Sequence, residues 1–203
     1  MIDLQKDAGL WTVTISRPDK ANSLTKAMLE QLADIAEAAN DAKVLVITGK
    51  GRVFSAGADL DEARAGLATD PVWERLSGAI SGAPCLTIAA LNGTLAGGAF
   101  GMALACDLRI AVPSAKFFYP VMKLGFLPQP SDPRRMRELI GPARTKMVLM
   151  AGQKLTADQA LQYGLVDRLV QADNMPEVIS ELSADVLAAS KEILSGIKSM
   201  CNS

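Results

Sequence analysis

Residues 89–111 read AALNGTLAGGAFGMALACDLRIA, and this stretch decides the fold that we predict for the 203-residue chain. It contains an apolar strand, a turn at Asn92-Gly93, the glycine pair Gly97-Gly98, a helix of small residues and a second strand. Glycine has no Cβ atom, so the backbone can turn tightly and approach a ligand closely. A helix that begins after such a turn presents free N–H groups. The pair therefore favours either tight packing of a buried helix or backbone donors aimed at a developing negative charge.

Strands and helices alternate on both sides of this stretch. The patterns at Leu10–Ser16 and Val44–Thr48 predict strands, and Thr25 is placed to cap a helix that runs to about Asn40. Alternation of this kind predicts parallel strands joined by right-handed crossovers, and hence an α/β fold. Further strands are predicted at residues 84–91, 107–112, 116–119 and 165–170, and further helices begin near residues 71, 132, 142, 156 and 175.

Composition narrows the class of protein. Hydrophobic residues make up 49% of the chain and charged residues 21%, which is enough to bury a substantial core. A formal net charge of −1 gives no electrostatic footprint for nucleic acid. The most apolar region, residues 84–106, is interrupted by Asn92, Thr94 and several glycines, so we expect no membrane span. The first residues do not resemble a signal peptide, and the three cysteines lack the spacing of a metal site, so we expect a cytoplasmic protein without a bound metal.

The chain contains no histidine. This absence excludes the Ser-His-Asp and Cys-His mechanisms together with the usual zinc sites. Any acid–base chemistry must therefore come from a carboxyl group, tyrosine, lysine, cysteine or water.

A second small-residue loop, FSAGADL at residues 54–60, follows the strand predicted at Val44–Thr48. This loop and the later NGTLAGGAFGMALACD together resemble the crotonase (enoyl-CoA hydratase/isomerase) superfamily. The resemblance continues through RPDKANSL at residues 17–24 and through the segments at residues 155–160 and 164–167. Because the motifs keep their order over nearly the whole chain, the resemblance is far more specific than one glycine-rich loop.

The resemblance implies an architecture that periodicity alone does not give. It implies a crotonase-like ββα spiral, with residues 1–140 as the acyl-CoA-binding core and residues 141–203 as a shortened helical C-terminal trimerisation region. A homotrimer or hexamer is expected, with an open site or an altered oligomer as a consequence of the shortening. Coenzyme A would enter as part of the substrate rather than as a separate cofactor. The implied activity is that of a lyase or isomerase acting on acyl-CoA in fatty acid metabolism.

The resemblance also assigns site residues by position. The backbone N–H groups of Ala58 and Gly98 correspond to an oxyanion hole for the thioester carbonyl, each donor contributing roughly 3 kcal/mol to transition-state stabilisation. Residues 17–24 match the region that contacts the adenine and pantetheine of coenzyme A. Lys20 and Ala21 are the candidates there, and Ala56 and Asp59 are placed in the same CoA region by the neighbouring loop. Lys20 is equally consistent with a solvated lysine in a loop between a strand and a helix.

The two catalytic carboxylate positions of the family's hydratases depart from the pattern. Gly101 stands three residues after the oxyanion glycine, where the first glutamate is expected, and Val121 stands at the place of the second. Neither side chain can move a proton. Since a placed general acid or base contributes roughly 10²–10⁴-fold, we expect ordinary enoyl-CoA hydration to be severely weakened.

Other residues near these positions are candidates to replace the glutamates. Asp61 follows the first oxyanion loop and either faces the acyl pocket or begins a solvated helix. Tyr119 is either a hydrogen-bond donor to the substrate or a core tyrosine. Gln129 stands where some relatives have an aspartate, and it can bind but cannot act as a base. For Asp132 the simplest role is to cap the helix that starts at Pro133.

The sequence leaves two classes of function open. The first is an acyl-CoA enzyme whose chemistry depends on enolate stabilisation: decarboxylation, thioester hydrolysis or an isomerisation that uses another base. The second is a catalytically silent acyl-CoA-binding or subunit-partner protein. A third interpretation, an enoyl-CoA hydratase/isomerase as the family name suggests, requires a different register at the two glutamate positions, although residues 92–107 match without a gap.

Overall fold

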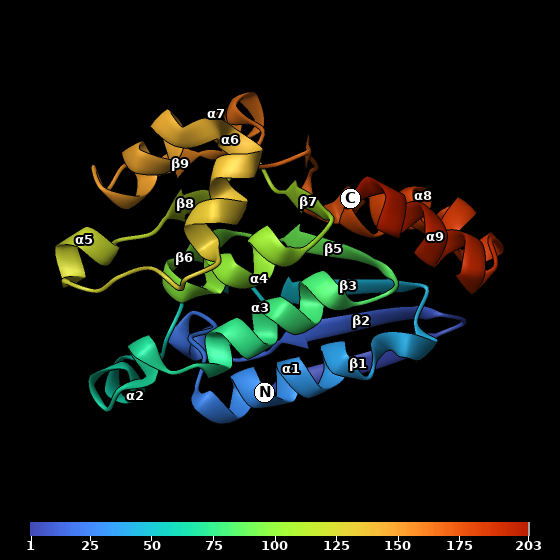
Figure 1. The fold of residues 1–203 in the computed structure, drawn as a ribbon, viewed down its shortest axis with the longest axis horizontal. Coiled ribbons are helices and arrows are strands. Elements are labelled where there is room, and N and C mark those ends of the chain that lie inside the picture. The colour runs from blue at the N-terminus through green and yellow to red at the C-terminus, as the bar shows by residue number, and fades with distance from the viewer. Residues whose placement is uncertain (203) are drawn as a thin grey trace.

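The computed structural model describes residues 1–202 and contains two β-sheets (Figure 1). The first sheet contains, in spatial order, β1 (Ile2–Asp7), β2 (Leu10–Ile15), β3 (Val44–Gly49), β5 (Leu86–Leu91), β7 (Leu108–Ala111) and β10 (Arg168–Leu169). The second contains β4 (Val53–Ser55), β6 (Thr94–Ala96), β8 (Lys116–Phe118) and β9 (Leu155–Thr156). β1 and β2 form an antiparallel hairpin, whereas β2, β3, β5 and β7 pair in parallel.

The chain advances as a spiral of ββα turns, as predicted. Each turn gives one strand to the first sheet, one to the second and then a helix, as in β3–β4–α3, β5–β6–α4 and β7–β8–α6. The helices are α1 (Lys26–Glu37), α2 (Leu60–Arg64), α3 (Val72–Gly82), α4 (Phe100–Ala105), α5 (Val121–Leu124), α6 (Asp132–Leu149), α7 (Ala157–Tyr163), α8 (Met175–Ala188) and α9 (Lys191–Cys201). No helix within residues 1–202 is long and apolar enough to cross a membrane.

Local sequence signals explain where several helices begin and end. Thr25 accepts a hydrogen bond from the Met28 N–H at the start of α1, which confirms the predicted cap. Thr156 and Gln159 form a reciprocal capping box at the start of α7, and Gly164 ends that helix in the left-handed conformation. These ends depend on residues within one turn of each other, so the sequence predicts them well.

The differences from the predicted elements have physical reasons. The short strands β4, β6 and β9 and the single-turn helix α5 were not predicted, because elements of two to four residues carry almost no periodicity. The strand expected at residues 165–170 is paired only at Arg168–Leu169. Gly141 is non-helical (φ 77°, ψ 166°), so α6 (Asp132–Leu149) is interrupted there, as expected from the separate helix starts predicted near residues 132 and 142. The C-terminal helical region is divided into α8 and α9.

The core lies around the central parallel strands. Val44, Leu45, Val46 and Ile47 of β3 are all buried, so both faces of that strand are covered. α1 and α3 lie side by side along the sheet, whereas α8 and α9 lie at the opposite end of the molecule from α5 (Figure 1).

α9 joins the rest of the protein mainly through polar contacts. Its Lys198 ammonium group donates hydrogen bonds to the Cys85 carbonyl oxygen at 2.7 Å and to the Asp107 carboxylate at 2.8 Å. No residue of α9 is fully buried, and Ile193 and Ile197 are both exposed. Lys191 of α9 also donates hydrogen bonds to the Asn40 carbonyl oxygen at 3.1 Å and to Asp41 at 3.3 Å. α9 is therefore fixed by charged side chains and not by a buried apolar stripe.

A buried asparagine joins the loop after β2 to the turn between β3 and β4. Asn22 is fully buried and accepts a hydrogen bond from the Arg17 N–H at 2.8 Å. Its amide nitrogen donates to the carbonyl oxygens of Lys50 at 2.9 Å and Val53 at 2.6 Å. Asn22 also has a positive φ of 52°, which asparagine tolerates better than most residues.

We predict that Asn22→Ala lowers the free energy of unfolding by about 2–3 kcal/mol, because it leaves buried backbone groups without partners. Urea unfolding of the purified protein measures this change. Asn40→Ala is the matched control. The Asn40 side chain is exposed and makes one long hydrogen bond, to the Glu37 carbonyl oxygen, so the change in the free energy of unfolding should stay within about 0.5 kcal/mol. Equal losses for the two variants would contradict the role assigned to Asn22.

Candidate active site

Loops from three turns of the spiral meet beside β4 and β6. The Ala56 N–H donates to the Ala21 carbonyl oxygen at 3.0 Å, the Leu24 N–H to the Gly57 carbonyl oxygen at 2.8 Å, and the Asp59 N–H to the Leu24 carbonyl oxygen at 2.8 Å. These bonds join the RPDKANSL loop to the FSAGADL loop, which are separated in sequence by α1 and β3. The RPDKANSL and FSAGADL motifs, which are far apart in the sequence, thus lie side by side.

Gly57 brings the second loop against the glycine pair at residues 97 and 98. Its φ is +92°, and a Cβ atom on it would lie 3.0 Å from the Ala96 carbonyl oxygen and 3.4 Å from the Gly98 nitrogen. Gly98 in turn packs against the Trp73 ring, which a Cβ atom at position 98 would approach to 3.2 Å. The glycine pair can therefore both allow close packing and present backbone donors, so the two predictions for it are compatible.

Two backbone N–H groups border the same pocket. Leu24 and Ala58 form a parallel β-bridge, whose two hydrogen bonds join Leu24 to the Gly57 carbonyl oxygen and to the Asp59 N–H. This bridge does not use the N–H group of Ala58. Gly98 lies in the first turn of the 3₁₀ helix Gly97–Ala99, where N–H groups have no acceptor within the helix. Ala58 and Gly98 both line the pocket.

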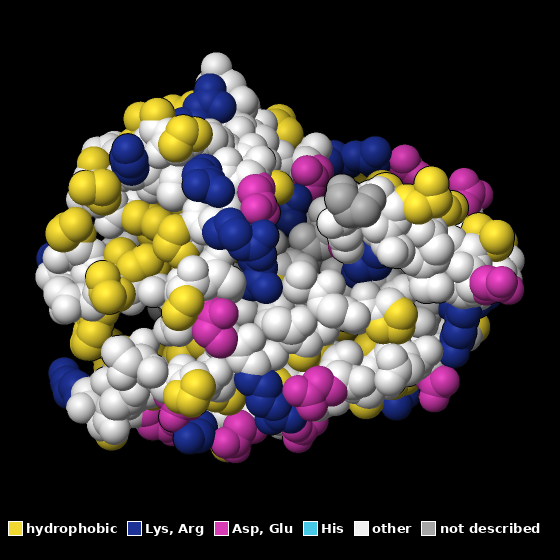
Figure 2. Space-filling view, in the orientation of Figure 1, with side chains coloured by type: hydrophobic (Ala, Val, Ile, Leu, Met, Phe, Trp, Pro, Cys, Tyr) yellow, Lys and Arg dark blue, Asp and Glu magenta, His cyan; other side chains and the backbone are white. Residues whose placement is uncertain are grey.

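The pocket has a volume of about 150 Å³ and a largely apolar wall. Its wall includes Trp73, Phe118, Leu124, Phe126 and Leu127. Figure 2 shows hydrophobic side chains gathered over α5 and its surroundings, on the left of the view. An apolar pocket with a few polar groups at one end is typical of a site that binds a small molecule with a hydrophobic chain.

A buried carboxylate lies behind this pocket, and it comes from α6. The Tyr119 hydroxyl donates a hydrogen bond to Asp132 Oδ2 at 2.9 Å, and Tyr119 lines the pocket. A Cβ atom at Gly101 would lie 3.1 Å from Asp132 Oδ1. The prediction that Asp132 caps α6 is therefore wrong: Ser131 is the N-cap residue, and the Asp132 side chain turns inward towards α4 and Tyr119.

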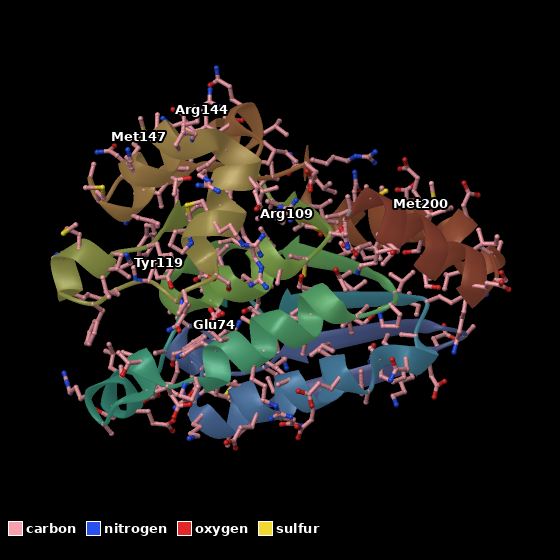
Figure 3. The ribbon with its side chains drawn as sticks, in the orientation of Figure 1. Glu74, Arg109, Tyr119, Arg144, Met147 and Met200 are labelled. Carbon is pink, nitrogen blue, oxygen red and sulfur yellow. The ribbon has the colours of Figure 1, made fainter. Side chains whose placement is uncertain are left out.

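Burial dominates the protonation of this pair. It raises the pKa of Asp132 to about 7, against the lowering effect of the Tyr119 hydrogen bond, and the Glu74 carboxylate adds to the increase. Burial also raises the pKa of Tyr119, and the Asp132 charge adds to that increase. Glu74 accepts hydrogen bonds from the N–H and hydroxyl groups of Ser131, so it lies at the start of α6, close to Tyr119 in Figure 3. The Asp132 carboxyl thus titrates near neutral pH, whereas the Tyr119 hydroxyl keeps its proton there.

Comparison with known proteins shows the family of the chain. The sequence model of the enoyl-CoA hydratase/isomerase family matches residues 5–203. The chain belongs to this family. A Mycobacterium leprae relative described as a probable enoyl-CoA hydratase is 35% identical over 176 residues, which cover 83% of this chain and 71% of that protein.

Two further comparisons place the whole fold in the family. The crotonyl-CoA hydratase of Syntrophomonas wolfei is 32% identical over 196 residues, covering 92% of this chain and 75% of the relative. The crystal structure of an enoyl-CoA hydratase from Bacillus anthracis superposes with a TM-score of 0.91 at 29% identity, covering 99% of this chain and 82% of that one. The chain is thus an enoyl-CoA hydratase/isomerase family protein with the predicted crotonase-like α/β spiral.

The structure does not bring Asp61 into the pocket of this family member, which corrects one prediction. Asp61 lies in the first turn of α2, its side chain is 90% exposed, and it pairs with Arg64. Asp59 fixes this direction, because its carboxylate caps α2 by accepting from the Asp61 N–H at 3.1 Å. The Arg17 guanidinium also donates to Asp59 at 2.8 Å and holds the pKa of that carboxyl below its usual range.

The remaining predicted residues lie at or beside the loop junction. Lys20 is exposed in the 3₁₀ helix Pro18–Lys20, and Ala21 follows it with a positive φ of 51°. Ala56 and Val121 line the pocket, so position 121 presents only hydrocarbon to it. Gln129 also lines the pocket, and its amide donates to the Ala68 carbonyl oxygen at 3.0 Å. A carboxylate on α6 was the residue that sequence reasoning misplaced.

We predict that Gly101 and Asp132 are energetically coupled. In the Asp132→Ala background, Gly101→Ala should stabilise the protein by up to about 1 kcal/mol, because alanine favours the helix. In the natural background the added methyl group meets the Asp132 carboxylate, so the same change should be neutral or destabilising. Urea unfolding of the two single variants and the double variant measures the coupling, which we expect at about 1–2 kcal/mol. Additive effects would contradict the contact.

Proposed function

We propose that this protein binds an acyl-CoA thioester in the pocket and stabilises an enolate of it between the N–H groups of Ala58 and Gly98. The observation that carries the proposal is the contact of Gly57 with Ala96 and Gly98, which sets both amides at the border of one apolar pocket. Backbone donors placed where negative charge develops contribute roughly 3 kcal/mol each. Family membership supports an acyl-CoA as the substrate.

The loop junction supports a location for the coenzyme A part of the substrate. Lys20, Ala21 and Ala56 lie where the RPDKANSL loop is bonded to the oxyanion loop, and we assign them to the coenzyme A. Asp59 belongs to the same assignment, in which it holds the loop through Arg17 and α2. The bound coenzyme A is part of the substrate and no other cofactor enters this proposal.

The reaction proposed is one that depends on the enolate and not on paired glutamates. Gly101 and Val121 supply no carboxylate, which argues against efficient hydration of an enoyl-CoA. Decarboxylation, thioester hydrolysis and an isomerisation that uses another base remain within this proposal. A silent acyl-CoA-binding protein is the competing function, which the same two residues favour.

We predict that crotonyl-CoA hydration by the purified protein is at least roughly 10²-fold slower than by an authentic hydratase at equal concentration. The loss of enoyl absorbance measures both rates. A rate equal to that of the authentic enzyme would contradict the assignment of Gly101 and Val121 and would require a displaced glutamate.

A second prediction tests the position of the Gly98 N–H. Gly57→Ala should slow exchange of the α-protons of butyryl-CoA with D₂O by roughly 10²-fold or more, because the new methyl group pushes the two loops apart. Gly51→Ala is the matched control: its φ is +84°, but a Cβ atom there meets only Pro18 at an ordinary 3.5 Å. NMR of the substrate measures the exchange.

The outcomes separate the proposals. Slow exchange in Gly57→Ala with normal exchange in Gly51→Ala supports the oxyanion hole. Equal slowing in both variants would assign the effect to backbone strain and count against it. Acyl-CoA binding without exchange or turnover across a broad thioester panel would select the silent binding protein.

A further inference from the structure

The buried pair of Tyr119 and Asp132 connects the pocket to a carboxylate that the family pattern does not provide. We propose that this pair is a proton relay for the acyl-CoA site, with Tyr119 as the catalytic residue that faces the substrate and Asp132 as the positioning residue that receives the proton from it. The inference rests on the proposed function and names the base that the function lacks.

Tyr119 is held in a fixed orientation between the pocket and Asp132. Its ring stacks on Phe100 with the centroids 5.4 Å apart. Its hydroxyl oxygen accepts from the Gln129 N–H at 3.4 Å, while the hydroxyl donates to Asp132 Oδ2 at 2.9 Å. Both Tyr119 and Gln129 line the pocket, so the Tyr119 hydroxyl, which is bonded to the Gln129 N–H and to Asp132, lies beside the pocket wall.

The other carboxylate oxygen supports a functional role for Asp132. The side chain has a relative exposure of 0%, and within the described part of the chain Oδ1 has no hydrogen-bond partner. A buried acceptor without a partner costs stability, and such costs are often associated with function. Gly101 provides the space for this oxygen, since a Cβ atom at Gly101 would lie 3.1 Å from it. The family's first glutamate position is thus occupied by a carboxylate from another helix.

The relay step balances without an oxidant or a further reactant. The Cα–H bond of the acyl group breaks, and its proton forms a new O–H bond with the Tyr119 oxygen. The original hydroxyl proton of Tyr119 passes to Asp132 Oδ2. The electron pair moves to the thioester oxygen, which becomes an enolate oxygen held by the N–H groups of Ala58 and Gly98. The reverse sequence returns the proton to the same or a neighbouring carbon.

The relay requires an ionised Asp132, so it predicts a pH dependence. Three groups act on the carboxylate: Tyr119 after β8, Glu74 on α3 and Arg135 on α6. Burial, the main influence, raises the pKa of Asp132 to about 7, so exchange should rise with pH up to about 7 and then level off. The folded protein also keeps this proton at a higher pH than the unfolded chain. The free energy of unfolding, relative to that of Asp132→Asn, should therefore decrease as the pH rises from about 4 to about 7.

The experiment is exchange of the α-protons of butyryl-CoA with D₂O between pH 5 and 9, followed by NMR of the substrate. We expect Tyr119→Phe and Asp132→Asn to slow exchange by roughly 10²-fold or more, with a butyryl-CoA Kd within about twofold of the natural protein. Asp132→Asn should also lose the rise near pH 7. Tyr163→Phe is the matched control, since the sequence contains two tyrosines and Tyr163 lies in α7, where its ring contacts Arg144.

Each outcome has a separate meaning. Normal exchange in Tyr119→Phe, or an unchanged pH profile in Asp132→Asn, would overturn the relay and leave the oxyanion proposal standing. If the natural protein binds butyryl-CoA but shows no exchange, the relay is overturned while binding stands. If it does not bind acyl-CoA, the proposed function and the relay both fail. Thermal unfolding of each variant tests whether a slower exchange comes from a loss of fold. If Asp132→Asn does not fold, Tyr119→Phe, which removes only the hydroxyl group, still tests the relay.

Discussion

The backbone hydrogen bonds between the RPDKANSL and FSAGADL loops are the constraint on which the site depends. They hold the second loop in place from one side, while its contact with the glycine pair limits it from the other. The loop can satisfy both only with glycine at position 57, where a methyl group would meet backbone atoms on β6. The backbone of the spiral thus positions the N–H groups of Ala58 and Gly98.

The carboxylate behind the pocket shows a different way of supplying a charged group. In this chain Gly101 on α4 leaves room for the Asp132 carboxylate on α6, because a Cβ atom at position 101 would lie only 3.1 Å from Asp132 Oδ1. Tyr119 then links that carboxylate to the pocket wall. A carboxylate can thus be supplied from a different helix while the order of the strands stays the same.

The resemblance of the motifs allowed the spiral to be predicted, and most helix starts could be predicted because a helix cap depends on neighbouring residues. Thr25 and Thr156 each cap a helix within one turn, and Gly57 and Gly98 stand in motifs of fixed spacing. The direction of Asp132 could not be predicted, since a carboxylate next to a proline is also the usual signal for a helix cap. For Asp61 the sequence left two orientations open, and the cap that Asp59 forms at the start of α2 leaves the Asp61 side chain exposed.

The polar attachment of α9 has a consequence for how the protein opens. None of the α9 residues lines the acyl pocket, and the helix contributes no fully buried side chain to the core. Loss of the Lys198 contacts to Cys85 and Asp107 would therefore weaken the attachment of the terminal helix while the ββα spiral stays folded. Because β3 is buried on both faces and α9 has no fully buried residue, we expect α9 to open at a lower free energy than β3.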